Sequence, residues 1–298
     1  MKINLVRSPD NPIIPVLPNS WKEEGTLVTV GILSLGSKYL FYYGGKSGGH
    51  RRLGIMTIEH EAFDGKTWNE YAHNPILDIG PPGSYDSKNL VDPATVYIKG
   101  KAFLYYSALG DGPDSIALAT STDGYHFRKF KDNPVIRGRA PEIVYKEGMF
   151  YLFYLLTGKE GGYEIRMSVS KDGFHFTDEQ VVLQPSASPA WDSFSLGNPR
   201  MFYNGTRYIM VYAGDDKSKD FPSFFGIAIS DDLLHWHRYS EKPIFEKGEK
   251  NSWDGKAIWC GGLFKHKDRY YLWYEGVGGP KEKMRPQIGL AYTENLNV

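Results

Sequence analysis

Two acidic residues, Asp92 and Glu142, stand out because they break a repeated pattern near the starts of expected strands. Four other repeats carry different residues at the position of Asp92: Val28, Ala140, Asn198 and Cys260. Two places further along, Glu142 is aligned with Ala94, Arg200 and Gly262. A purely structural position should hold similar residues in every repeat. The variation therefore favours a functional role for both acids.

Two carboxyl groups on neighbouring repeats have the chemistry needed to cleave a glycosidic bond. One carboxylic acid protonates the leaving oxygen, while a second carboxylate activates water or attacks the sugar. The acid needs a raised pKa, which burial or a nearby like charge supplies. An acid at a strand start can instead cap a loop or pair with an arginine, so a structural role for each stays open.

Aromatic and basic residues in the same region suit a sugar ligand. Indole faces can stack on the apolar face of a sugar, and the chain offers Trp21, Trp253 and Trp259. Arg139 and Arg200 can hold hydroxyls, a carboxylate or a phosphate through a fork of donors. Together with Asn198, these residues form part of the predicted substrate-binding set.

Aromatic–acid pairs precede three of the expected strands, at Tyr85-Asp86, Trp191-Asp192 and Trp253-Asp254. We include Asp86, Asp192 and Asp254 in the predicted substrate-binding set. Their recurrence also fits a structural staple, in which each aspartate accepts hydrogen bonds from loop N–H groups. Both interpretations stay open at this point.

The elements that position these residues are strands ending in adjacent aromatics. Most copies of this aromatic strand are followed along the chain by a polar Asp-Gly turn and then by a phrase such as Asn74-Pro-Ile-Leu77. The turn aspartates and the histidines that follow them (His126, His175 and His235) are expected to be structural. Five copies of the aromatic phrase are present, at 39–43, 103–106, 150–154, 208–212 and 270–274.

The repeat has a period of roughly 55–60 residues, which fits one four-stranded propeller blade with insertions. Pro12, Pro75, Pro134 and Pro243 mark the period along the chain. The sequence therefore predicts an all-β, five-bladed β-propeller that forms a single domain over residues 1–298. The last repeat stops at its third strand, 288–295, so we expect the N-terminal segment 2–6 to close the last blade.

Composition excludes several classes of function. The 298 residues carry equal numbers of acidic and basic side chains, so nothing favours nucleic acid or an anionic membrane as a partner. The single Cys260 permits no intrachain disulfide, and we expect a buried thiol. No apolar stretch is long enough for a membrane span, and no signal peptide is apparent, so we expect a cytoplasmic protein. No metal or cofactor motif is present, and we expect neither group.

The chain resembles the five-bladed propeller glycoside hydrolases, which include glycoside hydrolase families 43, 32, 62, 117 and 130. The resemblance spans the whole chain and rests on phrases such as Asn133-Pro-Val-Ile136, Ser121-Thr-Asp-Gly124 and Trp253-Asp254 leading to 270–274. It implies an active site in a pocket at one end of the channel, with acids from blades 1, 2 and 3. Val91-Asp92-Pro93 is similar to the Asp-Pro of blade 2 in family 32.

The chain departs from these families at two of the three acids. Glu142 follows Pro141, whereas families 32 and 43 place that glutamate before the proline, where this chain has Arg139. Blade 1 lacks the usual aspartate, and Glu23 and Glu24 are its nearest acids. The predicted catalytic set is Glu142 as general acid, Asp92 orienting substrate or tuning the pKa of Glu142, and Glu24 as candidate base.

The predicted activity is cleavage of a terminal sugar, possibly a furanoside, from an oligosaccharide or glycoside. A phosphorylase like family 130, in which phosphate replaces one carboxylate and arginines hold it, is the first alternative. A non-catalytic propeller that binds glycan or protein is the second. Residues 50–52 can overhang one channel end and touch substrate, although a solvated loop is the favoured interpretation.

Overall fold

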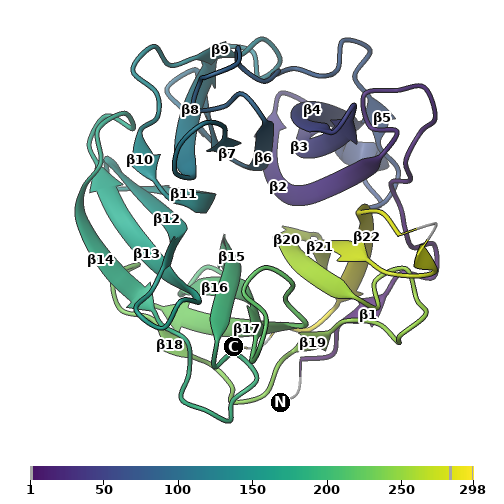
Figure 1. The fold of residues 1–298 in the computed structure, drawn as a ribbon, viewed down its shortest axis with the longest axis vertical. Helices are drawn as coiled ribbons and strands as arrows, with labels where there is room; N and C mark the ends of the chain where they lie inside the picture. The colour runs from purple at the N-terminus through teal and green to yellow at the C-terminus, as the bar shows by residue number, and fades with distance from the viewer. Residues whose placement is uncertain (1–2, 282–283, 297) are drawn as a thin grey trace.

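The computed structural model describes residues 3–281, 284–296 and 298, with 28–30 described for the backbone only. Its strands are arranged as sheets around a common centre, as in a propeller (Figure 1). The described part contains no α-helix, and the 3₁₀ segment η1 spans His60–Ala62. None of its described helical segments is long and apolar enough to cross a membrane.

Each strand group is named here by its innermost strand. The β2 group contains β2 (Gly25–Leu35), β3 (Lys38–Ser47), β4 (His50–Glu59) and β5 (Asn69–Glu70). The β6 group contains β6 (Asn89–Ile98), β7 (Lys101–Leu109), β8 (Ser115–Ser121), β9 (Arg128–Lys129) and β10 (Ile136–Arg137). A single parallel pair, Arg51–Asn89, joins these two groups into one hydrogen-bonded sheet.

The remaining strands form three separate sheets. The β11 group contains β11 (Arg139–Lys146), β12 (Met149–Thr157), β13 (Tyr163–Ser170) and β14 (Thr177–Leu183). The β15 group contains β15 (Ser195–Tyr203), β16 (Tyr208–Asp215), β17 (Phe224–Ser230), β18 (His237–Arg238) and β19 (Phe245–Glu246). The β20 group contains β20 (Ala257–His266), β21 (Arg269–Val277), β22 (Gln287–Thr293) and β1 (Val6–Arg7).

The N-terminal strand completes the C-terminal sheet. β1 runs antiparallel to β22, with Val6 opposite Tyr292 and Arg7 opposite Ala291. The sequence predicted this closure over residues 2–6, but the paired strand is Val6–Arg7, and Lys2 lies outside the described residues. Within this strand, the Arg7 guanidinium donates to the Asp254 carboxylate at 3.0 Å.

The asparagine of the Asn-Pro phrase explains why that phrase recurs. Asn74 accepts from the N–H of Ile55 at 2.9 Å and donates to the carbonyl of the same residue at 2.8 Å. Asn133 and Asn11 make the same pair of bonds to Leu118 and Leu290. Each asparagine therefore satisfies backbone groups of a third strand.

The Asp-Gly turns, and the equivalent Asp232-Leu233 turn, are held by their own side chains. In one copy, Asp232 accepts from the N–H groups of Leu234 and His235, and its other oxygen pairs with the His235 ring at 2.7 Å. Asp123 with His126 and Asp172 with His175 repeat the arrangement. The expectation that these aspartates and histidines are structural is confirmed.

Every innermost strand carries a β-bulge near its start. The register against the second strand shifts between Val91 and Ala94, and equivalent shifts occur in β2, β11, β15 and β20. Asp92, Ala140 and Asn198 lie in these bulges with φ values of 56°, 51° and 37°. A bulge turns a side chain away from the regular alternation, and positive φ is costly for residues other than glycine.

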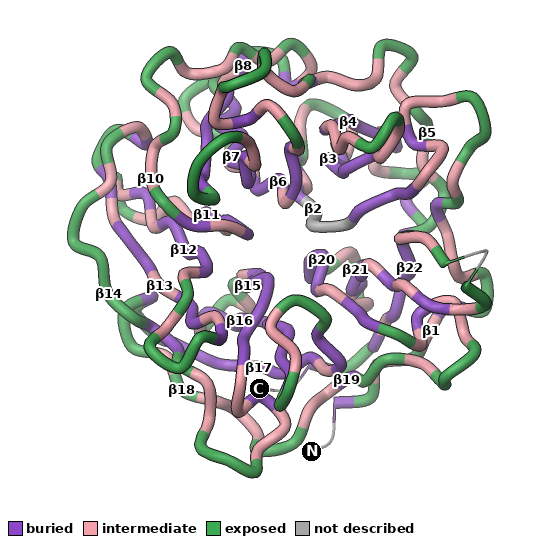
Figure 2. Tube along the Cα trace, in the orientation of Figure 1, coloured by how far each residue is buried: buried purple, intermediate pink, exposed green. Residues whose placement is uncertain are grey.

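The core lies between neighbouring sheets and consists largely of the repeated aromatic strands. Figure 2 shows these strands buried and the outer turns exposed. Tyr42, Tyr105, Tyr154, Tyr212 and Trp273 are almost fully buried. The innermost strands are thereby fixed against rigid sheets, so their starts converge on one region at the centre.

Candidate active site

A pocket of about 370 Å³ lies where the innermost strands converge. Residues of β2, β6, β11, β15 and β20 line it, so every strand group contributes. The segment 216–223, which connects β16 to β17, forms part of its wall. The bulge residues Asp92, Ala140 and Asn198 all line this pocket. Three of the five residues at this varying repeat position therefore contribute to the pocket wall.

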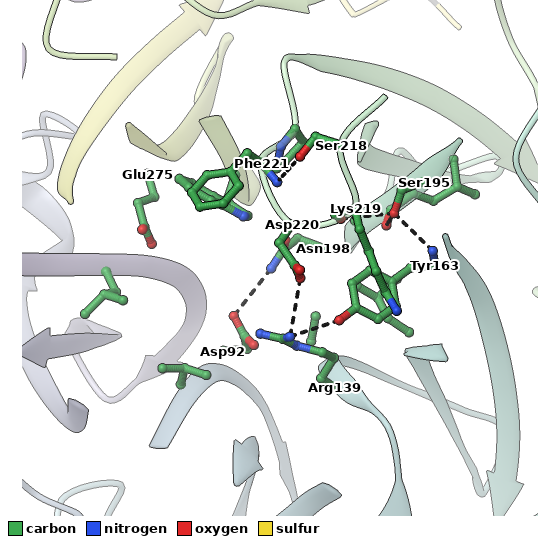
Figure 3. A pocket seen from close by; sticks show the side chains of 18 of the residues that line it. Asp92, Arg139, Tyr163, Ser195, Asn198, Ser218, Lys219, Asp220, Phe221 and Glu275 are labelled. Carbon is green, nitrogen blue, oxygen red and sulfur yellow. Dashed lines mark hydrogen bonds and ion pairs between the residues drawn. The ribbon is translucent and has the colours of Figure 1, made fainter. Parts of the chain in front are cut away.

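Asp92 is the one member of the predicted catalytic set that lines the pocket. The Ser107 hydroxyl donates to its Oδ2 at 2.7 Å, and the Asn198 amide lies 3.4 Å from its Oδ1 (Figure 3). Because Ser107 is fully buried on β7, the carboxylate is fixed by a rigid strand.

Arg139 faces Asp92 from the neighbouring strand group. Its guanidinium donates to the Tyr163 hydroxyl at 3.0 Å and lies 3.4 Å from Asp114 and 3.6 Å from Asp220. Burial disfavours its charge, but the charges of Asp92 and Asp114 together with the Tyr163 hydroxyl outweigh the burial and raise the pKa of Arg139. The pocket therefore holds a permanent cation beside a carboxylate.

The segment 216–223 brings a third set of groups to the pocket. The Ser195 hydroxyl donates to the carbonyl of Lys219 at 3.1 Å, and the Lys219 ammonium donates to Thr157 at 3.0 Å. These bonds attach the segment to β15 and β12. Phe221 remains 47% exposed and meets the Trp259 ring edge-on, with ring centroids 6.0 Å apart. The pair gives the rim an apolar surface.

Glu275 supplies another acid. It lies on β21, opposite Trp259 in the sheet register, and lines the pocket. Figure 3 shows it on the side of the pocket away from Tyr163 and Lys219. Asp92 and Glu275 therefore come from two strand groups and are both held on strands.

The structure places Glu142 outside the pocket lining. Its carboxylate accepts from the Arg200 guanidinium at 2.8 Å and from the N–H of Met201 at 3.0 Å. Burial raises the pKa of Glu142, and the charge of Arg200 opposes that rise. Arg200 is 1% exposed and also donates to the carbonyl of Pro141. This pair ties β11 to β15, and Arg200 is likewise not brought to the pocket.

Glu24 also lies outside the pocket lining. Its carboxylate pairs with Lys46 at 3.1 Å and accepts from the N–H of Gly49. The Lys46 hydrogen bond lowers the pKa of Glu24. The structure therefore gives Glu24 a role at the edge of the β2 group.

In three strand groups, the aromatic–acid pair forms a staple between the inner end and the outermost strand. Asp192 accepts from the Tyr212 hydroxyl at 2.9 Å and from Arg238 at 2.8 Å. Asp254 accepts from Tyr274 and from Arg7 at 3.0 Å each. Asp86 accepts from Lys129 at 2.6 Å. These aspartates are at most 2% exposed and do not line the central pocket.

The β2 group carries the same staple with its charges exchanged. Lys22 occupies the aspartate position and donates to Glu70 of β5 at 2.6 Å and to Tyr43 at 3.0 Å. Trp21 precedes it and packs over Gly45 and Gly54, where a Cβ would lie 2.3–2.4 Å from the indole. Trp253 packs in the same way over Gly276 and Gly289. Both indoles lie outside the pocket lining.

Of the predicted site residues, the structure brings Asp92, Arg139, Asn198 and Trp259 together. Residues that sequence analysis missed are Tyr163, Lys219, Asp220, Phe221 and Glu275. Arg51, for which a solvated loop was the favoured interpretation, instead lies on β4 and lines the pocket. For Lys219, Asp220 and Phe221, a usable signal was their place between the second and third strands of their repeat, the place predicted for residues 50–52 in theirs. Among described residues, no group of three or more His, Cys, Asp or Glu residues is arranged to hold a metal ion.

No protein-family model and no curated protein sequence matches the chain. Solved structures match it over nearly its whole length. A β-1,2-mannobiose phosphorylase from Listeria innocua, complexed with β-1,2-mannobiose, is 16% identical with a TM-score of 0.75, covering 97% of this chain and 96% of that chain. An N-acetylgalactosamine deacetylase from F. plautii, complexed with blood group B trisaccharide, is 16% identical with a TM-score of 0.76, covering 97% and 95%.

A glycosyl hydrolase from Bacteroides ovatus is 15% identical with a TM-score of 0.75, and the match covers 97% of this chain and 94% of that chain. At these identities the likeness concerns the fold. The chain has the propeller fold that these carbohydrate-active proteins share.

Proposed function

We propose that the protein is a carbohydrate-active enzyme, a glycoside hydrolase that removes a terminal sugar from an oligosaccharide. The observation that carries this proposal is Asp92, a carboxylate held in a left-handed bulge at the wall of the central pocket. Backbone strain of this kind persists where the surrounding structure fixes it, and it concentrates at functional sites. The fold shared with sugar-binding enzymes supports the same proposal.

The proposed mechanism uses Asp92 and Glu275 as the carboxyl pair. Glu275 transfers its proton to the glycosidic oxygen as the bond to the anomeric carbon breaks. Asp92 takes a proton from the water whose oxygen bonds to that carbon. The donors around Asp92 and the charge of Arg139 suit a carboxylate that works as a base. Phe221 and Trp259 provide an apolar surface for a sugar ring.

The first test measures sugar release from aryl glycosides and from plant and bacterial oligosaccharides. We expect Asp92→Asn and Glu275→Gln to lower kcat by roughly 10²-fold or more, as loss of an acid or base does. Glu294→Gln is the matched control, because Glu294 is an exposed acid paired with Arg269. Full activity in both Asp92→Asn and Glu275→Gln would refute the pair. Glu142→Gln belongs in the same series, because it tests the sequence-based prediction of Glu142 as general acid against the proposed role of Glu275.

A phosphorylase is the second candidate, favoured by the cations of the pocket. Arg51, Arg139 and Lys219 all line it, and such side chains can hold a phosphate that replaces one carboxylate. Repeating the assay with and without inorganic phosphate separates the two activities. Free sugar formed without phosphate supports hydrolysis, and sugar phosphate formed only with phosphate supports phosphorolysis. Sugar binding without turnover would instead support a binding propeller.

We further infer that the strand groups are five blades of one ring within a single domain, 1–298. The five bulges and the recurring staple support this count, because each strand group carries one bulged inner strand. The substrate partner is an oligosaccharide or glycoside. A cytoplasmic location stays a prediction.

A further inference from the structure

Ser107 connects two pocket walls that belong to different strand groups. It lies on β7, is completely buried and does not line the pocket itself. Its hydroxyl donates to Asp92 Oδ2 at 2.7 Å and accepts from the N–H of Ala140 at 2.7 Å. A hydroxyl has one proton to donate, so the two bonds fix its orientation.

Both partners of Ser107 are bulge residues with left-handed backbones. Asp92 has φ 56° in β6 and Ala140 has φ 51° in β11. Ala140 directly follows Arg139, whose guanidinium is held near Asp92. The Ala140 N–H is buried, and an unpaired buried N–H is costly, so Ser107 also stabilises the bulge that aims Arg139.

We propose that Ser107 is a positioning residue that sets the separation and orientation of Asp92 and Arg139 across the two strand groups. This rests on the proposed function, in which Asp92 is one of the two catalytic carboxyl groups. Ser107 touches no substrate. It acts by fixing the Asp92 carboxylate and by holding the backbone from which Arg139 extends.

The chain contains a matched control for the loss of such a hydroxyl. Ser170 is 3% exposed, donates to the Asp172 carboxylate at 2.9 Å and accepts from the N–H of Gly173 at 2.9 Å. Ser170→Ala therefore removes the same two kinds of hydrogen bond from an outer turn. Ser107→Thr keeps the hydroxyl at the position under test.

The experiment measures kcat, KM, the pH profile and Tm for Ser107→Ala, Ser107→Thr, Ser170→Ala and Asp92→Asn. We expect Ser107→Ala to lower kcat by roughly 10- to 100-fold, as small displacements of catalytic groups do. We also expect its pH profile to differ from that of the wild type, because the Asp92 carboxylate loses a hydrogen-bond donor. Ser170→Ala should show the same fall in Tm as Ser107→Ala but keep the wild-type kcat and pH profile. Ser107→Thr should recover most of the rate.

A crystal structure of Ser107→Ala gives a readout that does not depend on turnover. We expect the Asp92 carboxylate to rotate and the Ala140 bulge to shift away from β6. Wild-type kcat and pH profile in Ser107→Ala, with Asp92→Asn inactive, would refute the role of Ser107 and leave the proposed function standing. Full activity in Asp92→Asn would refute the role of Asp92 and, with it, that of Ser107. An unchanged Asp92 and Ala140 in the variant structure would also overturn the proposal.

Discussion

Asp92, Ala140 and Asn198 hold left-handed backbone conformations that cost about 1 kcal/mol or more for residues with a Cβ. The equivalent bulges place all three at the same pocket. The structure retains this cost at a repeat position whose residue type varies between strand groups. Strain and variation thus coincide at the place where the sheets meet, which is how a repeated fold acquires an individual site.

Cys260 occupies the same repeat position in β20 but is completely buried. Burial raises the pKa of its thiol to about 12, and the thiolate is the nucleophilic form. We therefore predict no reaction of the native protein with Ellman's reagent at about pH 8. In denaturant, the single cysteine should react with a stoichiometry of one thiol per chain. Rapid labelling of the folded protein would contradict the buried position.

At the scale of the element, the staple of the β15 group lacks one hydrogen bond that its counterparts have. Ser84 donates to Asp86 Oδ1 and Ser252 donates to Asp254 Oδ1, both at 2.8 Å. Asp192 Oδ1 is buried without a partner, because Ala190 stands at the serine position. The same group has Ser186 where the other two have a glycine whose Cβ would lie 2.1 Å from the carboxylate.

We predict that the double variant Ser186→Gly/Ala190→Ser is more stable than the wild type by about 1 kcal/mol, the usual contribution of a hydrogen bond. Urea unfolding followed by fluorescence measures the difference. Ser84→Ala is the reciprocal variant, and its loss should be about 1–3 kcal/mol because it removes the donor to a buried carboxylate. No gain in the double variant would mean that the carboxylate already has a donor in solution.

The aspartates of the repeated turns, among them Asp232, should make the stability of the protein depend on pH. The hydrogen bond from His235 is the largest of several contacts that lower the pKa of Asp232. A carboxyl group whose pKa is lowered in the folded state stabilises the protein at pH values above its unfolded pKa of about 3.9. This stabilisation is lost as the pH falls from the unfolded pKa through the lower folded pKa. Urea unfolding should therefore show that the free energy of unfolding decreases as the pH is lowered from about 5 to about 2. The variant Asp232→Asn should show a smaller decrease over the same range. Equal slopes in both proteins would contradict the assignment.

The elements of the repeat could be predicted from the sequence because their causes are local. The Asn-Pro phrase, the Asp-Gly turn and the aromatic strand each satisfy their own backbone or core. The ion pair between Glu142 and Arg200 could not, since it joins strands of two sheets and depends on their approach. The segment 216–223 joins the second and third strands of its repeat, whereas the alignment compared the starts of the innermost strands, so it did not place Asp220 or Phe221 at the pocket.

At the scale of the whole molecule, ring closure depends on a strand of only two residues. β1 covers the edge of β22, and Arg7 reaches Asp254, which is 2% exposed. Arg7 also lies over the Phe245 ring at 4.2 Å. We predict that Arg7→Ala lowers the free energy of unfolding by roughly 1–2 kcal/mol, more than a fully exposed ion pair contributes, because a buried carboxylate loses its cation.

Thermal and urea unfolding measure this effect, and Arg7→Lys is the control that keeps the charge. Removal of residues 1–7 should destabilise the protein further and promote association, because it uncovers the N–H and C=O groups along β22. Unchanged stability of both variants would show that closure does not depend on the N-terminal strand.

The exchanged staple charges of the β2 group affect which sheet the N-terminal strand β1 can pair with. Lys22 faces Glu70 there, whereas the aspartates of the other staples face cations from outermost strands. If the N-terminal strand took the outer place in the nearby β2 group, Arg7 would meet Lys22, and two like charges would repel. In the β20 group the same arginine meets Asp254. One reversed ion pair thus gives the β2 and β20 groups opposite charges at the same staple position. This difference favours pairing of the N-terminal strand with the β20 group.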